Sequence, residues 1–159
     1  MKKIKFLLLT MLIAMVGVFA SCSKDSKTKQ EGHNQIRTAR ALDSLVNVCK
    51  TKNLKYVIVD DRSKSQYDAG HVPGSVWLMD GNVYNMDNNE YAKAVKTYCD
   101  EHNLAGFNTI VFLISDGSYA LTTTMAGSIS TYGFKMSHTY ALMGGFPAWQ
   151  KEYPDRIEK

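Results

Sequence analysis

Cysteine and basic residues are both scarce in the second half of this 159-residue sequence. There are 3 cysteines, and none follows Cys99. Between Gly106 and Trp149 the only basic residues are Lys135 and His138. The sequence therefore excludes a cysteine nucleophile and an arginine-lined anion site from the segment between Gly106 and Trp149.

A strong positive charge is also lacking, although the formal net charge of the whole sequence is +4. Three of the 19 basic residues, at positions 2, 3 and 5, precede an apolar run from Phe6 to Ala20. Without them, residues 22–159 have 16 basic and 15 acidic residues, a net charge of +1. This balance gives no argument for a nucleic-acid partner, and we expect none.

The longest apolar run is too short to cross a membrane comfortably. It lies between the lysines at positions 2, 3 and 5 and the sequence Ala20-Ser21-Cys22, the pattern of a lipoprotein signal peptide. We therefore predict a signal peptide over residues 1–21 and a lipid on Cys22 that holds the protein to a membrane of the cell envelope, at the outer membrane or periplasmic face in a Gram-negative cell. The alternative is an ordinary secretory signal whose cysteine is incidental.

The remaining chain divides into a tether and one domain. Residues 22–34 are rich in Lys, Ser, Gln and Gly without apolar periodicity, which predicts a flexible tether. Residues 35–159 are enough for a single domain with its own core and too few for two.

Within the domain, strand and helix patterns alternate. A capping box formed by Ser63 and Gln66 predicts a one-turn helix that Gly70 ends in a left-handed conformation, and residues 80–88 have the composition of a polar loop. The alternation predicts an α/β fold with a central parallel sheet and helices on both faces. The elements expected are strands at 56–59, 76–78, 109–114 and 138–142, and helices at 35–53, 64–69, 89–102, 121–132 and 146–151.

Two motifs in this pattern resemble the rhodanese family. The first motif consists of Asp60, Arg62, Gln66, Tyr67, Gly70, His71, Val72, Pro73, Gly74 and Ser75, and the second of Gly133, Phe134, Leu142, Gly144, Gly145, Phe146 and Trp149. The resemblance implies a rhodanese-like fold and a thiosulfate sulfurtransferase family. It also implies an active-site loop after the strand at 109–114, with a cysteine that forms a persulfide and arginines that hold the anion.

This loop departs from the family pattern. The residues from 114 onward are Ile114, Ser115, Asp116, Gly117, Ser118 and Tyr119. Aligned on Gly117, Ile114 stands where the cysteine belongs, and Ser115 and Tyr119 replace the arginines. In the other register Asp116 takes the cysteine's place, so neither alignment supplies a thiol. We expect no catalytic residue here, and we expect Asp116 to occupy the loop's backbone N–H groups as an internal anion.

The sequence therefore predicts a degenerate, non-catalytic binding or accessory module, with an envelope protein as one candidate partner. Two enzymatic alternatives remain: handling of sulfane sulfur with a partner's thiol, or a divergent activity that uses Ser115 or Ser118 as nucleophile.

The other candidate residues receive structural interpretations. Arg62 is expected to form a buried ion pair at the end of its strand, and His71 to make a local hydrogen bond within its turn. Cys49 and Cys99 are expected to be buried and free, with a disulfide between them as the alternative. The four histidines show no ligand spacing, so we expect neither a metal nor a cofactor.

Overall fold

The computed structural model describes residues 34–79, 88–117 and 119–159, all within one compact unit. The signal peptide, Cys22, the tether up to residue 33, the loop at 80–87 and Ser118 lie outside the described residues, as do the side chains of residues 34, 88, 89 and 119–123. In the described ranges, no helix combines the length and the apolar character needed to cross a bilayer.

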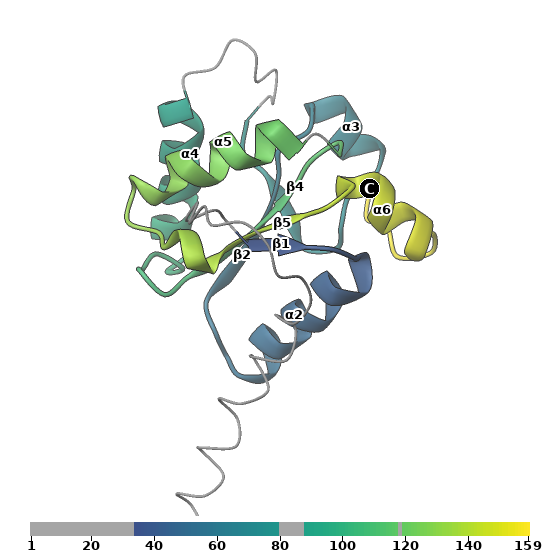
Figure 1. Ribbon diagram of the computed structural model, residues 1–159, viewed down its shortest axis with the longest axis horizontal. Helices are drawn as coiled ribbons and strands as arrows, with labels where there is room; N and C mark the ends of the chain where they lie inside the picture. Colours follow the sequence, from purple (N-terminus) through teal and green to yellow (C-terminus); the bar gives the residue numbers. More distant parts are fainter. Residues whose placement is uncertain (1–33, 80–87, 118) are drawn as a thin grey trace, which may run out of the picture. The chain divides into compact units, whose positions relative to one another are not determined.

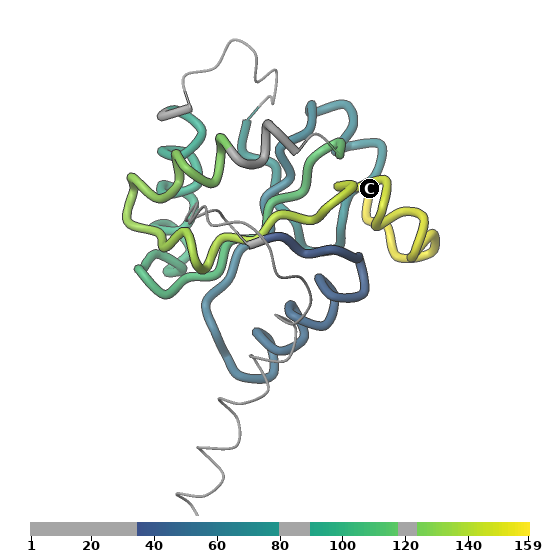
Figure 2. The backbone as a smooth tube through the Cα atoms, viewed as in Figure 1, coloured from purple at the N-terminus to yellow at the C-terminus, as the bar shows by residue number. Residues whose placement is uncertain are grey.

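A five-stranded sheet forms the centre of the domain, in the order β1-β5-β4-β2-β3, and every neighbouring pair is parallel. The strands are β1 (Asn34–Ile36), β2 (Tyr56–Asp60), β3 (Ser75–Trp77), β4 (Ile110–Ile114) and β5 (Thr139–Leu142). Figure 2 follows the backbone and shows β1 beside β5, so the first and last strands of the described chain are neighbours in one sheet. The predicted parallel α/β architecture is confirmed.

Helices cover both faces of this sheet (Figure 1). They are α2 (Ala39–Thr51), α3 (Lys64–Ala69), α4 (Asn88–Glu101), α5 (Tyr119–Ser130), the 3-10 helix η2 (Met136–His138) and α6 (Gly145–Glu152). Alternate residues of the central strands point to opposite faces. Ile58 and Phe112 pack with the buried residues of α2 and α6, whereas Val57 and Val59 pack with those of α4 and α5.

The prediction of a helix from Gln35 is wrong at its start. Gln35 and Ile36 belong to β1, and α2 begins only at Ala39, after the N-cap Thr38. Ile36 satisfies helical spacing with the buried residues of α2, but it is opposite Leu142 in the sheet and its carbonyl accepts a hydrogen bond from the Met143 N–H at 2.8 Å. A strand of three residues is too short for its own periodicity to be recognised.

The helix at 64–69 and its capping box are confirmed, but the conformation predicted for Gly70 is wrong. Its φ of 158° and ψ of 140° are not those of a left-handed helical residue. A Cβ at this position would lie 2.7 Å from the Ile157 Cγ2 atom, so glycine is required here by close packing of the C-terminal segment.

Other boundaries move by a few residues. Leu78 follows β3, and His138 belongs to η2 rather than to β5. The helix predicted at 121–132 is α5 at 119–130, and hydrogen-bonded turns lead from it to Gly133, whose φ is 91°.

Candidate functional site at the carboxyl ends of the strands

The junction after β2 is built around a buried ion pair. The Arg62 Nε atom donates to Asp60 Oδ1 at 2.9 Å, and Arg62 Nη2 donates to Asp60 Oδ2 at 2.7 Å. Nη2 also donates to the Gly70 carbonyl at 2.8 Å, and the guanidinium stacks 3.9 Å from the centre of the Phe146 ring. The ion pair expected from the sequence is present, and it ties β2, the end of α3 and α6 together.

The turn from Gly70 to Gly74 is fixed by its own helix and by the end of the chain. The His71 Nδ1 atom lies 3.1 Å from the Tyr67 carbonyl, and the two rings stack at 3.9 Å. The His71 and Glu158 backbones exchange two hydrogen bonds, and the Gly74 N–H donates to a Glu158 carboxylate oxygen at 2.9 Å. The local hydrogen bond expected for His71 is present, but no local sequence pattern indicates that residue 158 closes this turn.

Two buried positions lead into the loop after β4. Ile114 is fully buried in β4, and Ser115 is only 2% exposed. The Ser115 Oγ atom accepts a hydrogen bond from the Gly117 N–H at 3.1 Å. The Ser115 hydroxyl therefore serves the loop's own backbone, and neither of these positions offers a group that could attack a substrate.

A pair of glycines holds this loop against the next one. The Phe146 N–H donates to the Ser115 carbonyl at 2.8 Å. A Cβ on Gly145 would lie 2.1 Å from that same carbonyl oxygen and 2.6 Å from the Gly117 nitrogen. Gly144 and Gly145 also have positive φ angles of 72° and 54°. From the sequence these glycines indicated only a turn, whereas the structure shows that they allow two backbones to touch.

Asp61 is a buried carboxyl group that sequence reasoning missed. It is 2% exposed, and neither of its carboxyl oxygens has a hydrogen-bond partner among the described residues. Burial raises the pKa of Asp61 well above its ordinary value, and the nearby carboxylates of Asp60 and Asp116 raise it further. The available signal was an acidic residue placed directly after a buried strand.

Tyr91 of α4 has a similar environment. Its hydroxyl is buried without a hydrogen-bond partner in the described part of the chain. Burial raises the pKa of Tyr91 well above its ordinary value, and Asp61 and Asp60 add to that rise. The carboxyl edge of the sheet thus contains a carboxyl group and a phenol that burial holds in their protonated forms.

Asp116 is exposed and faces an open pocket of about 660 Å³. The pocket lies between α3, α6 and the C-terminal segment, and its polar lining residues include Arg62, Gln66, Asp116, Gln150, Asp155 and Lys159. The structure thus brings Arg62 and Asp116, which come from different loops, to one pocket. The internal role predicted for Asp116 stays a prediction, because Ser118 and the first side chains of α5 lie outside the described residues.

The two cysteines outside the signal region are buried and free. Cys49 lies in the core beneath α2 and Cys99 in the core beneath α4, on opposite faces of the sheet. Burial raises the pKa of Cys49, and it raises the pKa of Cys99 to about 11, with a contribution from Asp100. The interpretation as buried thiols is confirmed, and neither is a thiolate near neutral pH. No three potential metal ligands cluster within the described ranges.

Comparison with known proteins agrees with this geometry. The family model of the Rhodanese-like domain matches residues 38–152. The chain belongs to the rhodanese-like domain family. It is 26% identical over 104 residues to the thiosulfate sulfurtransferase GlpE of Pseudoalteromonas translucida (strain TAC 125), a match that covers 65% of this chain and 81% of that protein.

Solved structures of the family have the same fold. The As-Sb reductase from Leishmania major aligns with a TM-score of 0.55 at 18% identity, over 78% of this chain and 84% of that chain. The rhodanese-like domain from the Anabaena sp. Alr3790 protein aligns with a TM-score of 0.52 at 19% identity, over 80% of this chain and 78% of that chain. At these identities the likeness shows the fold alone.

Proposed function

We propose that this rhodanese-like domain is a non-catalytic binding module that a lipid on Cys22 attaches to the cell envelope. The observation that carries the proposal is the loop after β4. Ile114 and Ser115 are buried, the Ser115 hydroxyl is bonded within the loop, and no cysteine or arginine occurs between residues 114 and 119. A hydroxyl cannot accept a sulfane sulfur as a persulfide, so the chemistry of the family has no acceptor atom in this loop.

The thiols of Cys49 and Cys99 do not replace the missing acceptor atom. Each lies buried in an apolar core on one face of the sheet, and each has a raised pKa that keeps it protonated. The retained features, the ion pair of Arg62 and the turn at His71, stabilise the fold and do not require a substrate.

A thiosulfate:cyanide assay on the purified chain tests the catalytic part of the proposal. We expect no turnover above background, with the Pseudoalteromonas sulfurtransferase as the positive control. Turnover by the wild type would contradict the proposal, and a Cys49→Ser/Cys99→Ser double variant would show whether the buried thiols carry it. Labelling by a serine-reactive phosphonate that disappears in Ser115→Ala or Ser118→Ala would instead support the serine-dependent alternative.

Cell fractionation tests the lipid anchor separately. Replacing Cys22 with Ala should allow a high-salt wash to release the protein from membranes into the soluble envelope fraction, whereas the wild type should stay bound, because the acyl chains provide membrane affinity that salt does not screen. Unchanged membrane association of this variant would contradict the anchor without bearing on the catalytic question.

A further inference from the structure

We infer that the amino edge of the sheet is a docking surface for an anionic lipid bilayer. We call this surface the lysine edge and define it by Lys52, Leu54, Lys55, Phe107 and Lys135. The inference rests on the lipid anchor proposed above, because that anchor would hold the domain beside a membrane.

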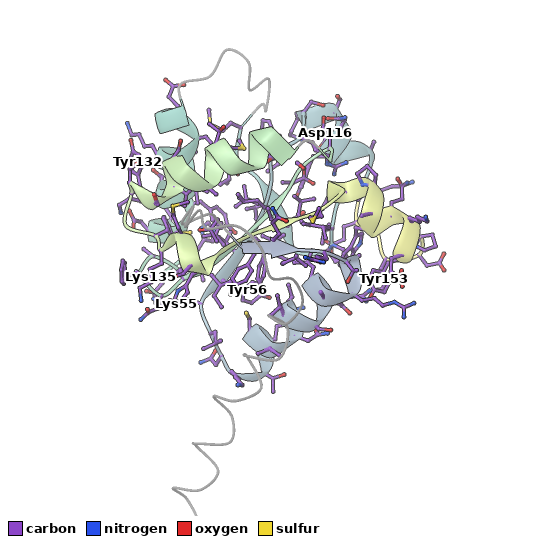
Figure 3. All side chains as sticks on the ribbon, in the orientation of Figure 1. Lys55, Tyr56, Asp116, Tyr132, Lys135 and Tyr153 are labelled. Carbon is purple, nitrogen blue, oxygen red and sulfur yellow. The ribbon has the colours of Figure 1, made fainter. Side chains whose placement is uncertain are left out.

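Topology brings these residues to one edge. All five strands are parallel, so their amino ends share one edge of the sheet. Residues 52–55, 102–109 and 131–138 connect α2, α4 and α5 to the amino ends of β2, β4 and β5. Figure 3 shows Lys55 and Lys135 on the same side of the domain and Asp116 on the other side.

The charge of these connections is of one sign. Residues 52–55, 102–109 and 131–138 contain three lysines and no aspartate or glutamate. The nearest acids in the chain are Asp100, whose carboxylate lies 2.6 Å from Lys96 Nζ, and Glu101. At the carboxyl edge, by contrast, Arg62 is already paired with Asp60, and the pocket there contains two acids, Asp116 and Asp155, as well as Lys159.

Exposed apolar groups accompany the lysines. Phe107 is 61% exposed and Leu54 is 44% exposed. The Lys135 Nζ atom lies 4.2 Å from the centre of the Phe107 ring and 3.2 Å from the Asn108 side-chain oxygen. An exposed ring beside a lysine suits the headgroup region, where the ring can enter the acyl boundary while the amine meets lipid phosphates.

The anchored chain would enter the domain at this same edge. Asn34 is the first residue of β1, and the strand register places it level with Ile58 and Phe112, two residues from the amino ends of β2 and β4. The twelve residue steps from Cys22 to Asn34 span roughly 40 Å at most. A lipid on Cys22 would thus keep the lysine edge within reach of the bilayer.

Vesicle sedimentation tests the surface independently of lipidation. The mature chain with Cys22→Ala should sediment with phosphatidylcholine vesicles that contain phosphatidylglycerol and not with phosphatidylcholine alone.

Lys55→Glu/Lys135→Glu should lower the partition coefficient at least tenfold, since each lysine near an anionic surface contributes about fivefold. Lys93→Glu/Lys151→Glu, which changes two exposed lysines on α4 and α6, makes the same change in net charge and should lower it much less. Absence of binding, binding without phosphatidylglycerol, or equal losses in the two variants would overturn the inference.

Fluorescence quenching tests the orientation of the lipidated protein. A fluorophore attached through Phe107→Cys should be quenched by headgroup-labelled nitroxide lipids, and one attached through Met143→Cys, at the exposed residue after β5, should not. Stronger quenching at position 143 would overturn the inference. If mass spectrometry of the Cys22 peptide showed no acyl chains, it would contradict the proposed lipid anchor. The vesicle experiment would then be the test of whether the lysine edge binds a bilayer.

Discussion

The junction after β2 and the loop after β4 lie on neighbouring strands, yet they differ in what their residues do. At the first, the Arg62 guanidinium donates to the Asp60 carboxylate and the Gly70 carbonyl, and the Arg62 carbonyl accepts a hydrogen bond from the Trp77 indole N–H. At the second, the hydroxyl of Ser115 serves the loop backbone, and a carboxylate, Asp116, faces the pocket. The comparison shows that the first junction is held by a buried ion pair, whereas the loop after β4 contains no cysteine or arginine between residues 114 and 119.

Removing the arginine of the first junction should have the largest effect. Arg62→Ala leaves Asp60 buried and unpaired, and breaking such a pair costs about 3–5 kcal/mol. Urea denaturation should show this loss, and Arg156→Ala, which breaks the more exposed pair with Asp43, should lose much less. Equal losses in the two variants would mean that the Arg62 pair does not hold the junction together.

A methyl group added between the loop after β4 and the start of α6 should cause the next largest loss of stability. Gly145→Ala places a Cβ against the Ser115 carbonyl and the Gly117 nitrogen, so we expect a loss of roughly 1–3 kcal/mol from overpacking. Gly74→Ala is the matched control, because its φ of 75° is also positive but no atom lies within 4 Å of the added Cβ. If both variants lose the same stability in urea, the close contact between the loops does not matter.

The unpaired Asp61 carboxyl predicts an unusual dependence of stability on pH. Its pKa is raised in the folded state, so the folded protein binds a proton that the unfolded chain has released. Stability from this group is therefore present at low pH and lost as pH rises from the ordinary aspartate range through the raised pKa. Asp61→Asn should abolish that loss. At pH values above the raised pKa, its free energy of unfolding should therefore exceed that of the wild type by an amount on the order of 1–3 kcal/mol.

Urea denaturation of wild type and Asp61→Asn at several pH values between 4 and 8 measures this difference. Asp43 contributes a slope of the opposite sign, because Arg156 lowers its pKa, so the comparison between the two proteins is the informative quantity. If the free energies of unfolding of the two proteins changed in parallel with pH, the Asp61 carboxyl would ionise normally.

Much of the fold could be predicted because its signals are local. The β-branched runs of β2 and β4 end at buried positions, and the capping box of α3 needs only residues three apart. The boundaries that were wrong depend on contacts between distant residues. β1 exists because residues 34–36 add to β5, and Gly70 is extended because the Ile157 side chain packs against it.

The site could be predicted only in part, for the same reason. The Asp60–Arg62 pair joins residues two apart and follows from the motif. The placement of Asp61 beside Tyr91, and of Gly145 against Ser115, joins residues about thirty apart that only the folded sheet brings together. No local pattern shows that a carboxyl group will be buried without a partner.

The central claim is that the loop after β4 has lost its anion site and that Asp116 takes the anion's place. Calorimetric titration of the purified chain with thiosulfate tests this claim most directly. We predict no measurable heat of binding for the wild type and a gain of affinity in Asp116→Ala, which should also lose on the order of 1 kcal/mol of stability because a capping group is removed. Asp155→Ala, which removes another carboxylate of the same pocket, is the control and should not gain affinity. Saturable binding of thiosulfate to the wild type, or no gain in Asp116→Ala, would contradict the account.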